Sequence, residues 1–162
     1  MAGAMRFQNA SNITDIHITE DGKWVILGDY IYWSAGLPQG CIDAINAECN
    51  EYDKINCISF NDYGDWTVIG EKTFYASSAV LNQINIAKDA YGFVEYVNVT
   101  NDAFLVVCSN GYRSSIGFDA PIMKKLSSAL DTINFTPKIV KLFYDGSYFI
   151  GSQDVNRWIA EF

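Results

Sequence analysis

The sequence predicts an α+β protein of four ββα repeats, with an antiparallel sheet of about eight strands and helices packed on one face. Three observations lead to this prediction. A hairpin-like stretch occurs four times, an aromatic residue follows each of its turns, and segments with helical periodicity separate the copies. The copies are 17–28, 59–70, 97–108 and 140–151. Their aromatic residues, Trp24, Trp66, Phe104 and Tyr148, lie 42, 38 and 44 residues apart, a near-constant spacing typical of repeat proteins.

Each copy has a turn signal between two apolar runs. Asp21-Gly22 and Asp145-Gly146 are strong hairpin signals, because glycine accepts the positive φ that a tight turn needs. Asn101-Asp102 occupies the turn of the third copy. Strands joined by short turns are antiparallel, so each copy predicts an antiparallel hairpin.

The first segment gives the order of elements. Residues 13–18 alternate between apolar and polar, and residues 24–27 pair back on them. Residues 29–38 form an aromatic arm that can be a short third strand. Pro38 suits the first turn of a helix, whose apolar positions recur every three or four residues at Cys41, Ile42, Ile45 and Cys49.

The second and third segments repeat this order. The second helix begins at Ser77 or Ser78 and ends at Gly92. The third is capped by Asp119 and has Pro121 in its first turn. The expected strands are 54–60, 66–70, 93–99 and 104–108, and the expected arms are 73–77 and 111–117.

The fourth segment lacks the arm. Its hairpin leads directly into a short closing helix with Val155, Trp158, Ile159 and Phe162 on its apolar side. A divergent last unit is typical of a repeat array. The sequence therefore predicts a single domain of four repeats at about 13–53, 54–92, 93–136 and 137–162, and a curved solenoid of the same units is the alternative arrangement.

Alternation along the hairpins predicts which side each strand buries. One side is apolar and is expected beneath the helices: Ile16, Ile18, Ile58, Phe60, Val97 and Val99. The opposite side is polar and is expected to meet solvent: His17, Thr19, Ser59, Asn61, Asn98 and Thr100.

Composition narrows the class of protein. The net charge of −8 over 162 residues argues against nucleic acid as a partner. No apolar run reaches the length of about 18 residues needed to span a membrane, and no signal peptide is recognisable. Cys41, Cys49, Cys57 and Cys108 lack metal-type spacing, so we expect free thiols, no metal or cofactor and a cytoplasmic location.

The pattern Asp-Gly-x-Trp-Val-Ile, then Gly, then Tyr-x-x-x-Gly-Leu-Pro resembles a family of bacterial strand-hairpin-helix repeat proteins. It is carried by Asp21-Gly22, Trp24-Val25-Ile26, Gly28, Tyr32 and Gly36-Leu37-Pro38. Only the first segment matches it well. The layout is also similar to PepSY-like and β-lactamase-inhibitor-like folds, whose members mostly bind other proteins. The resemblance therefore implies protein binding and transfers no catalytic residue.

The three arms align as two large residues followed by two small ones. We interpret them as a row of aromatic and Arg side chains suited to binding a protein partner or a second copy of the chain. The leading hypothesis is thus a non-enzymatic binding or inhibitory protein. The candidate residues are Tyr32, Trp33, Phe74, Tyr75, Tyr112, Arg113, Ser114 and Ser115, with Trp33, Tyr75 and Arg113 at one shared position.

The alternative hypothesis is a small-ligand binder for an anion or nucleotide. The loop 110–119 contains two Gly, two Ser and Arg113, and it leads to a helix N-terminus where backbone N–H groups are free. An enzyme is not expected. His17 is the only histidine, so neither a catalytic triad nor a histidine-based metal centre is available.

Overall fold

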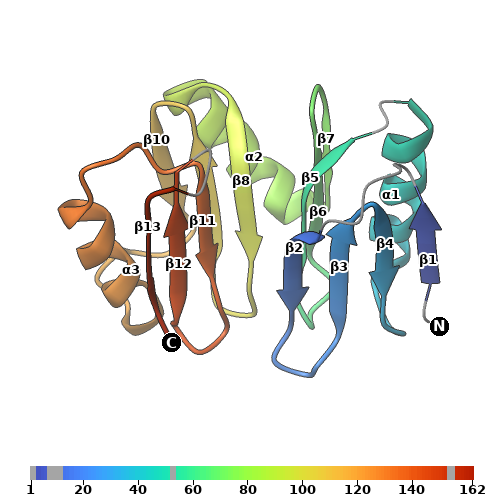
Figure 1. Cartoon of the computed structure of the whole chain (residues 1–162), viewed down its shortest axis with the longest axis horizontal. Coiled ribbons are helices and arrows are strands. Elements are labelled where there is room, and N and C mark those ends of the chain that lie inside the picture. The colour runs from blue at the N-terminus through green and yellow to red at the C-terminus, as the bar shows by residue number, and fades with distance from the viewer. Residues whose placement is uncertain (1–2, 7–12, 52–53, 153–155) are drawn as a thin grey trace. The chain divides into compact units, whose positions relative to one another are not determined.

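The computed structural model describes residues 3–6, 13–51, 54–152 and 156–162, and its contacts divide the chain into two compact units, Met1–Leu81 and Asn82–Phe162. The described residues form three helices and thirteen strands, and the strands belong to four antiparallel sheets (Figure 1). The predicted α+β class with antiparallel strands is confirmed. The prediction of one sheet with about eight strands is wrong.

The first unit contains two sheets and α1 (Gln39–Glu51), which lies against β5 and β6. The first sheet has the order β1-β4-β3-β2, and the second has the order β5-β6-β7. Their strands are β1 (Gly3–Arg6), β2 (Ile13–Ile18), β3 (Trp24–Gly28), β4 (Tyr30–Trp33), β5 (Ile55–Phe60), β6 (Trp66–Gly70) and β7 (Phe74–Ala76).

The second unit also contains two sheets, ordered β10-β9-β8 and β11-β12-β13. α3 (Pro121–Thr132) lies against β12, and α2 (Ser78–Tyr91) includes the boundary between the units. The strands are β8 (Val94–Val99), β9 (Phe104–Cys108), β10 (Gly111–Ser114), β11 (Ile139–Leu142), β12 (Tyr148–Gly151) and β13 (Trp158–Glu161).

The turns form where the sequence predicts them. Gly22 has φ +83° and Gly146 has φ +85°, a conformation that glycine adopts without steric cost. The four aromatic residues each open the second strand of a hairpin, opposite Ile18, Phe60, Val99 and Leu142. Tyr148 is buried, and Trp24, Trp66 and Phe104 are half-buried.

The arms contain the third strands β4, β7 and β10. At the end of each arm strand, a serine forms hydrogen bonds with the aromatic residue that opens the second strand of the hairpin. Ser34 Oγ accepts a hydrogen bond from the Trp24 N–H at 2.9 Å, while the Ser34 N–H donates to the Trp24 carbonyl at 2.9 Å. The same two bonds join Ser77 to Trp66 and Ser115 to Phe104. The small residues of the arms thus satisfy backbone groups where two strands end.

Two helix predictions are wrong. The expected closing helix is the strand β13, and its predicted residue Val155 lies outside the described residues. β13 pairs with β12 and satisfies backbone groups that would otherwise lie at the edge of that sheet. The N-cap of α3 is Ala120, with no side-chain hydrogen bond, rather than Asp119. Pro121 lies in the first turn as predicted.

The polar side chains expected to meet solvent are buried, and this explains why the sheets remain separate. His17 of β2 bonds to the backbone of β5: its Nε2 lies 2.6 Å from the Phe60 carbonyl, and its Nδ1 lies 3.3 Å from Ser59 Oγ. These contacts replace a backbone ladder between β2 and β5. His17, Thr19, Ser59, Asn61, Asn98 and Thr100 are all at most 6% exposed.

In the second unit, a buried polar side chain likewise bonds to the backbone of a neighbouring sheet. The Asn98 side chain of β8 donates to the Val140 carbonyl and accepts from the Leu142 N–H at 2.9 Å. One amide group therefore satisfies two backbone groups of β11. The apolar side predicted for the hairpins is correct for Ile58, Phe60, Val97 and Val99, which are buried. It is wrong for Ile16 and Ile18, which are 42% and 48% exposed.

Candidate binding face

The first sheet has one buried face and one exposed apolar face, because its strands are apolar on both sides. On the buried face, Val25, Leu27, Ile31 and Trp33 join a core with α1 and the second sheet. The opposite side chains point away from that core. We call them the outer face, which consists of Ile16, Ile18, Trp24, Ile26, Tyr30 and Tyr32.

Strand register makes the outer face continuous. Ile16, Ile26 and Tyr32 lie opposite one another on three neighbouring strands, and Ile18 lies opposite Trp24. Tyr30 lies beside Tyr32, with ring centroids 5.9 Å apart. Tyr32 is 44% exposed and Tyr30 is 39% exposed, while Trp24 and Ile26 are half-buried. Large aromatic side chains that reach solvent from a rigid sheet are typical of binding surfaces.

The predicted row of Trp33, Tyr75 and Arg113 does not form an exposed surface. Trp33 is only 8% exposed because alternation along β4 turns it into the core. Tyr75 is half-buried and packs against the same core. Arg113 is half-buried, and its Nε donates to Gln83 Oε1 at 3.0 Å. In the first arm, the neighbouring residue Tyr32, and not Trp33, is the side chain that reaches solvent.

The remaining arm residues also have structural contacts. Phe74 is half-buried in β7. Tyr112 packs edge-on against Phe118 with ring centroids 5.4 Å apart, and burial is the main cause that raises the pKa of its hydroxyl. Asp131 and Tyr91 raise this pKa further by electrostatic repulsion of the phenolate.

The two serine hydroxyl groups of the loop 110–119 accept hydrogen bonds from backbone N–H groups. Ser114 Oγ accepts from the Ile116 N–H at 3.2 Å, and Ser115 Oγ accepts from the Phe104 N–H at 2.8 Å. The Asp119 carboxylate lies close to Gly117, so close that a β-carbon there would be 2.4 Å from its oxygen. A carboxylate at this position repels an anion, and the geometry of the loop favours a structural role.

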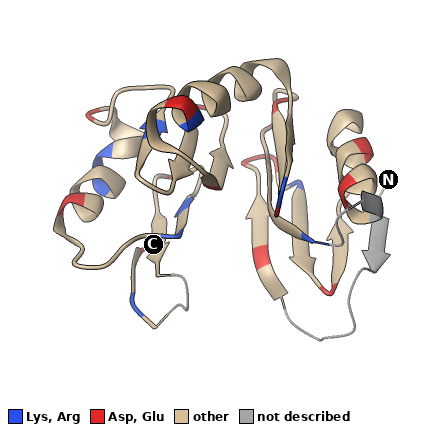
Figure 2. Cartoon of the chain, turned by 90° about the horizontal axis from the view of Figure 1, so that it is seen from above, with Lys and Arg blue, Asp and Glu red and all other residues tan. Residues whose placement is uncertain are grey.

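The charge of the chain is concentrated in the unit that carries the outer face. Residues 1–81 contain 11 acidic and 4 basic residues, whereas residues 82–162 contain 8 acidic and 7 basic residues. α1 has acidic but no basic residues (Figure 2). Lys23, next to the outer-face residue Trp24, is paired with Asp62 at 3.1 Å. The unit that carries the outer face is therefore predominantly acidic.

Sequence reasoning missed Ile16, Ile18 and Tyr30 as surface residues. A usable signal was present, because Trp24–Gly28 and Tyr30–Trp33 are apolar at nearly every position. Strands of this kind are expected where both faces of a sheet meet apolar surroundings. The first sheet covers a core on one side only, so its second apolar face remains exposed.

Comparisons of the chain with protein-family models, with curated protein sequences and with solved structures found no match. The similarity to strand-hairpin-helix repeat proteins therefore stays a prediction. Among the described residues, no three His, Cys, Asp or Glu side chains gather closely enough to hold a metal ion. None of the described helices combines the length and apolar character of a membrane span.

Proposed function

We propose that this chain is a non-enzymatic binding or inhibitory protein whose outer face docks onto another protein. The observation that supports this most directly is the exposure of Ile16, Ile18, Tyr30 and Tyr32 on one side of a regular sheet. Their burial by a partner would remove apolar surface from water, which is the main driving force of protein association. The sheet fixes their positions, so little conformational entropy is lost on binding.

The proposed partner is a protein with an apolar patch surrounded by Lys and Arg. Charge complementarity supports this choice, because the first unit has 11 acidic residues against 4 basic ones. A second copy of the chain would bring two acidic units together, which electrostatic repulsion opposes. We therefore propose association with a different protein rather than self-association.

We also propose that the four hairpins are repeats of one unit. The first three hairpins have a register irregularity at the same place, between Ile13 and Asp15, Ile55 and Cys57, and Val94 and Tyr96. In the same three segments a serine closes the arm onto the aromatic residue. Local features of this kind are expected to recur when units share an origin.

The test compares two surface variants in a binding experiment. The outer-face variant is Ile18→Ser with Tyr32→Ser, and the matched control is Trp158→Ser, an aromatic residue of β13 that is 61% exposed. A protein captured from source cells with wild-type bait would be purified and titrated against all three forms. We expect the outer-face variant to bind at least tenfold more weakly, since a hot-spot residue contributes about 2 kcal/mol.

Further measurements distinguish the partners. Binding of a basic partner should weaken as salt is raised, because screening reduces attraction between exposed charges. Equal affinity of the outer-face variant and wild type would contradict the proposed face. Sedimentation that shows a dimer abolished by Ile18→Ser with Tyr32→Ser would replace the basic partner with a second copy.

A further inference from the structure

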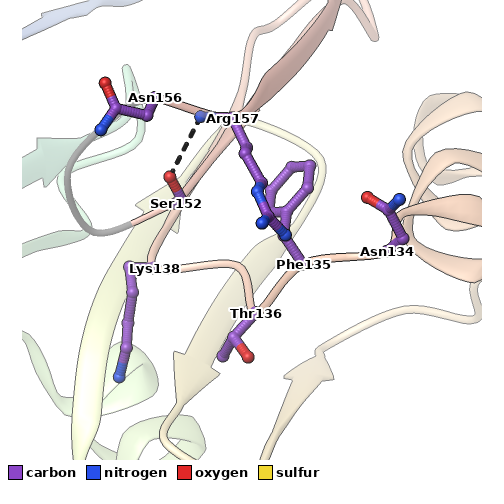
Figure 3. A pocket seen from close by; sticks show the side chains of 7 residues that line it. All are labelled: Asn134, Phe135, Thr136, Lys138, Ser152, Asn156 and Arg157. Carbon is purple, nitrogen blue, oxygen red and sulfur yellow. Dashed lines mark hydrogen bonds between the residues drawn. The ribbon is translucent and has the colours of Figure 1, made fainter.

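The second unit contains a polar pocket that none of the sequence predictions includes. It has a volume of about 670 Å³ and lies where the connection from α3 to β11 meets Ser152, Asn156 and Arg157 (Figure 3). This volume is within the range of about 300–1,000 Å³ that small-molecule sites occupy. The described residues that line it are Asn134, Phe135, Thr136, Lys138, Ser152, Asn156 and Arg157.

Backbone hydrogen bonds hold the walls in place. The Lys138 N–H donates to the Gly151 carbonyl at 2.9 Å, and the Ser152 N–H donates to the Arg157 carbonyl at 2.9 Å. The Arg157 N–H in turn donates to Ser152 Oγ at 3.2 Å, the bond drawn in Figure 3. The pocket is thus formed without a ligand, which lowers the cost of binding one.

The lining carries positive charge. Lys138 Nζ is paired with Glu95 Oε1 at 2.7 Å, which offsets its charge. Arg157 is exposed, and within the described part of the chain no ion pair occupies its guanidinium group. No Asp or Glu is among the described lining residues. One guanidinium group is therefore available to bind an anion.

The uncharged lining residues add two further properties. Phe135 is half-buried and presents a flat apolar surface. Asn134 and Thr136 are exposed and supply neutral donors and acceptors. A guanidinium group recognises the two oxygens of a carboxylate or phosphate with paired hydrogen bonds, and a phenyl ring stacks on planar groups.

We propose that this pocket binds a small organic oxyanion attached to a planar ring. Arg157 would bind the oxyanion and Phe135 would pack against the ring, while Lys138 stays paired with Glu95. The proposal is independent of the outer face, since it concerns a different unit of the chain and a different kind of ligand.

The experiment titrates ¹⁵N-labelled protein with defined probes and follows the backbone amide resonances of Lys138, Ser152 and Arg157. Adenosine 5′-monophosphate represents a ring with a phosphate, and 4-hydroxybenzoate represents a ring with a carboxylate. Adenosine and inorganic phosphate supply each half alone. We expect saturable shifts with at least one ring-bearing anion, at a dissociation constant of about 1 mM or tighter, and at least tenfold weaker binding of adenosine and phosphate.

Two matched variants locate the binding site. Arg157→Gln should weaken binding at least tenfold, while Arg113→Gln, which removes the other arginine of this unit, should leave it unchanged. Amide resonances far from the pocket report whether each variant is folded. Lack of saturable shifts with both ring-bearing anions would overturn the proposal. Undiminished binding by Arg157→Gln would also overturn it, as would loss of binding in Arg113→Gln, which would assign the anion to the 110–119 loop.

Discussion

Asn98 shows how a single polar side chain can join two sheets. Its amide donates to the Val140 carbonyl and accepts from the Leu142 N–H, and the side chain is 1% exposed. His17 occupies the corresponding place in the first unit, one residue before the position opposite the aromatic residue. Its ring also meets polar groups of the next sheet: Nε2 lies 2.6 Å from the Phe60 carbonyl oxygen and 3.2 Å from the Phe60 nitrogen, and Nδ1 lies 3.3 Å from Ser59 Oγ.

Replacement of Asn98 by alanine should therefore be costly. Asn98→Ala leaves a buried carbonyl and a buried N–H without their partner, and each unsatisfied group costs about 1–3 kcal/mol. Urea denaturation should show this loss in the free energy of unfolding. Asn85→Ala, at an exposed site of α2, is the matched control and should change stability little. A loss below about 0.5 kcal/mol for Asn98→Ala would contradict the role of its amide.

At the scale of the element, a buried carboxylate lies where α1 packs against β6. Glu48 is 0% exposed, and its Oε2 accepts a hydrogen bond from Thr73 Oγ1 at 2.8 Å. The side chain passes directly over Gly70, where a β-carbon would lie 1.6 Å from Oε1. Gly70 is thus needed for close approach of the helix to the strand rather than for its backbone conformation.

A double-mutant cycle tests this contact. Gly70→Ala should destabilise the protein by roughly 1–3 kcal/mol, because the methyl group displaces the carboxylate in a packed interior. In a Glu48→Ala background the same substitution should cost clearly less, because the obstacle is gone. Thermal or urea unfolding of the four forms gives the coupling energy. Equal costs in the two backgrounds would show that the methyl group clashes with something other than Glu48.

Local elements could be predicted well from the sequence, and their assembly could not. Helices near Pro38, Ser78 and Pro121 follow from apolar periodicity and start signals. The single sheet was wrong because pairing between hairpins depends on long-range contacts, and here buried side chains such as His17 take the backbone groups that a ladder would use. Polar residues alternate with apolar ones in a strand both when the polar side faces water and when it faces another sheet. The alternation therefore could not distinguish these two cases, and it led to the wrong prediction that His17 meets solvent.

The candidate site was located only in part for a related reason. Tyr32 was identified in its arm, but the arm was treated as a surface feature, so Trp33 beside it was also expected to be exposed. Because this part of the arm is the strand β4, its successive side chains point to opposite faces of the sheet, so Tyr32 is exposed and Trp33 is buried. The pocket around Arg157 gave no local signal, because residues of the α3–β11 connection line it together with Ser152, Asn156 and Arg157, which lie farther along the chain.

At the scale of the whole molecule, the burial of the four cysteines shows that both units have tightly packed interiors. Cys41, Cys49 and Cys57 belong to the first unit and Cys108 to the second, and none of them is in a disulfide. Cys41, Cys57 and Cys108 are at most 4% exposed, whereas Cys49 is half-buried. Burial raises the pKa of the Cys41 thiol to about 12, and burial together with the Glu95 carboxylate raises the pKa of Cys108.

These environments predict a sharp difference in thiol reactivity. The thiolate is the reactive form, and with a pKa of about 12 only about one Cys41 in 10⁴ is ionised at pH 8. Alkylation of the native protein should therefore modify Cys49 first and leave Cys41, Cys57 and Cys108 largely unmodified, as peptide mass spectrometry would show. In urea without reductant, all four should react. Two equivalents instead of four would reveal a disulfide, and native labelling of Cys41 as fast as Cys49 would mean that the first unit opens far more readily than its packing implies.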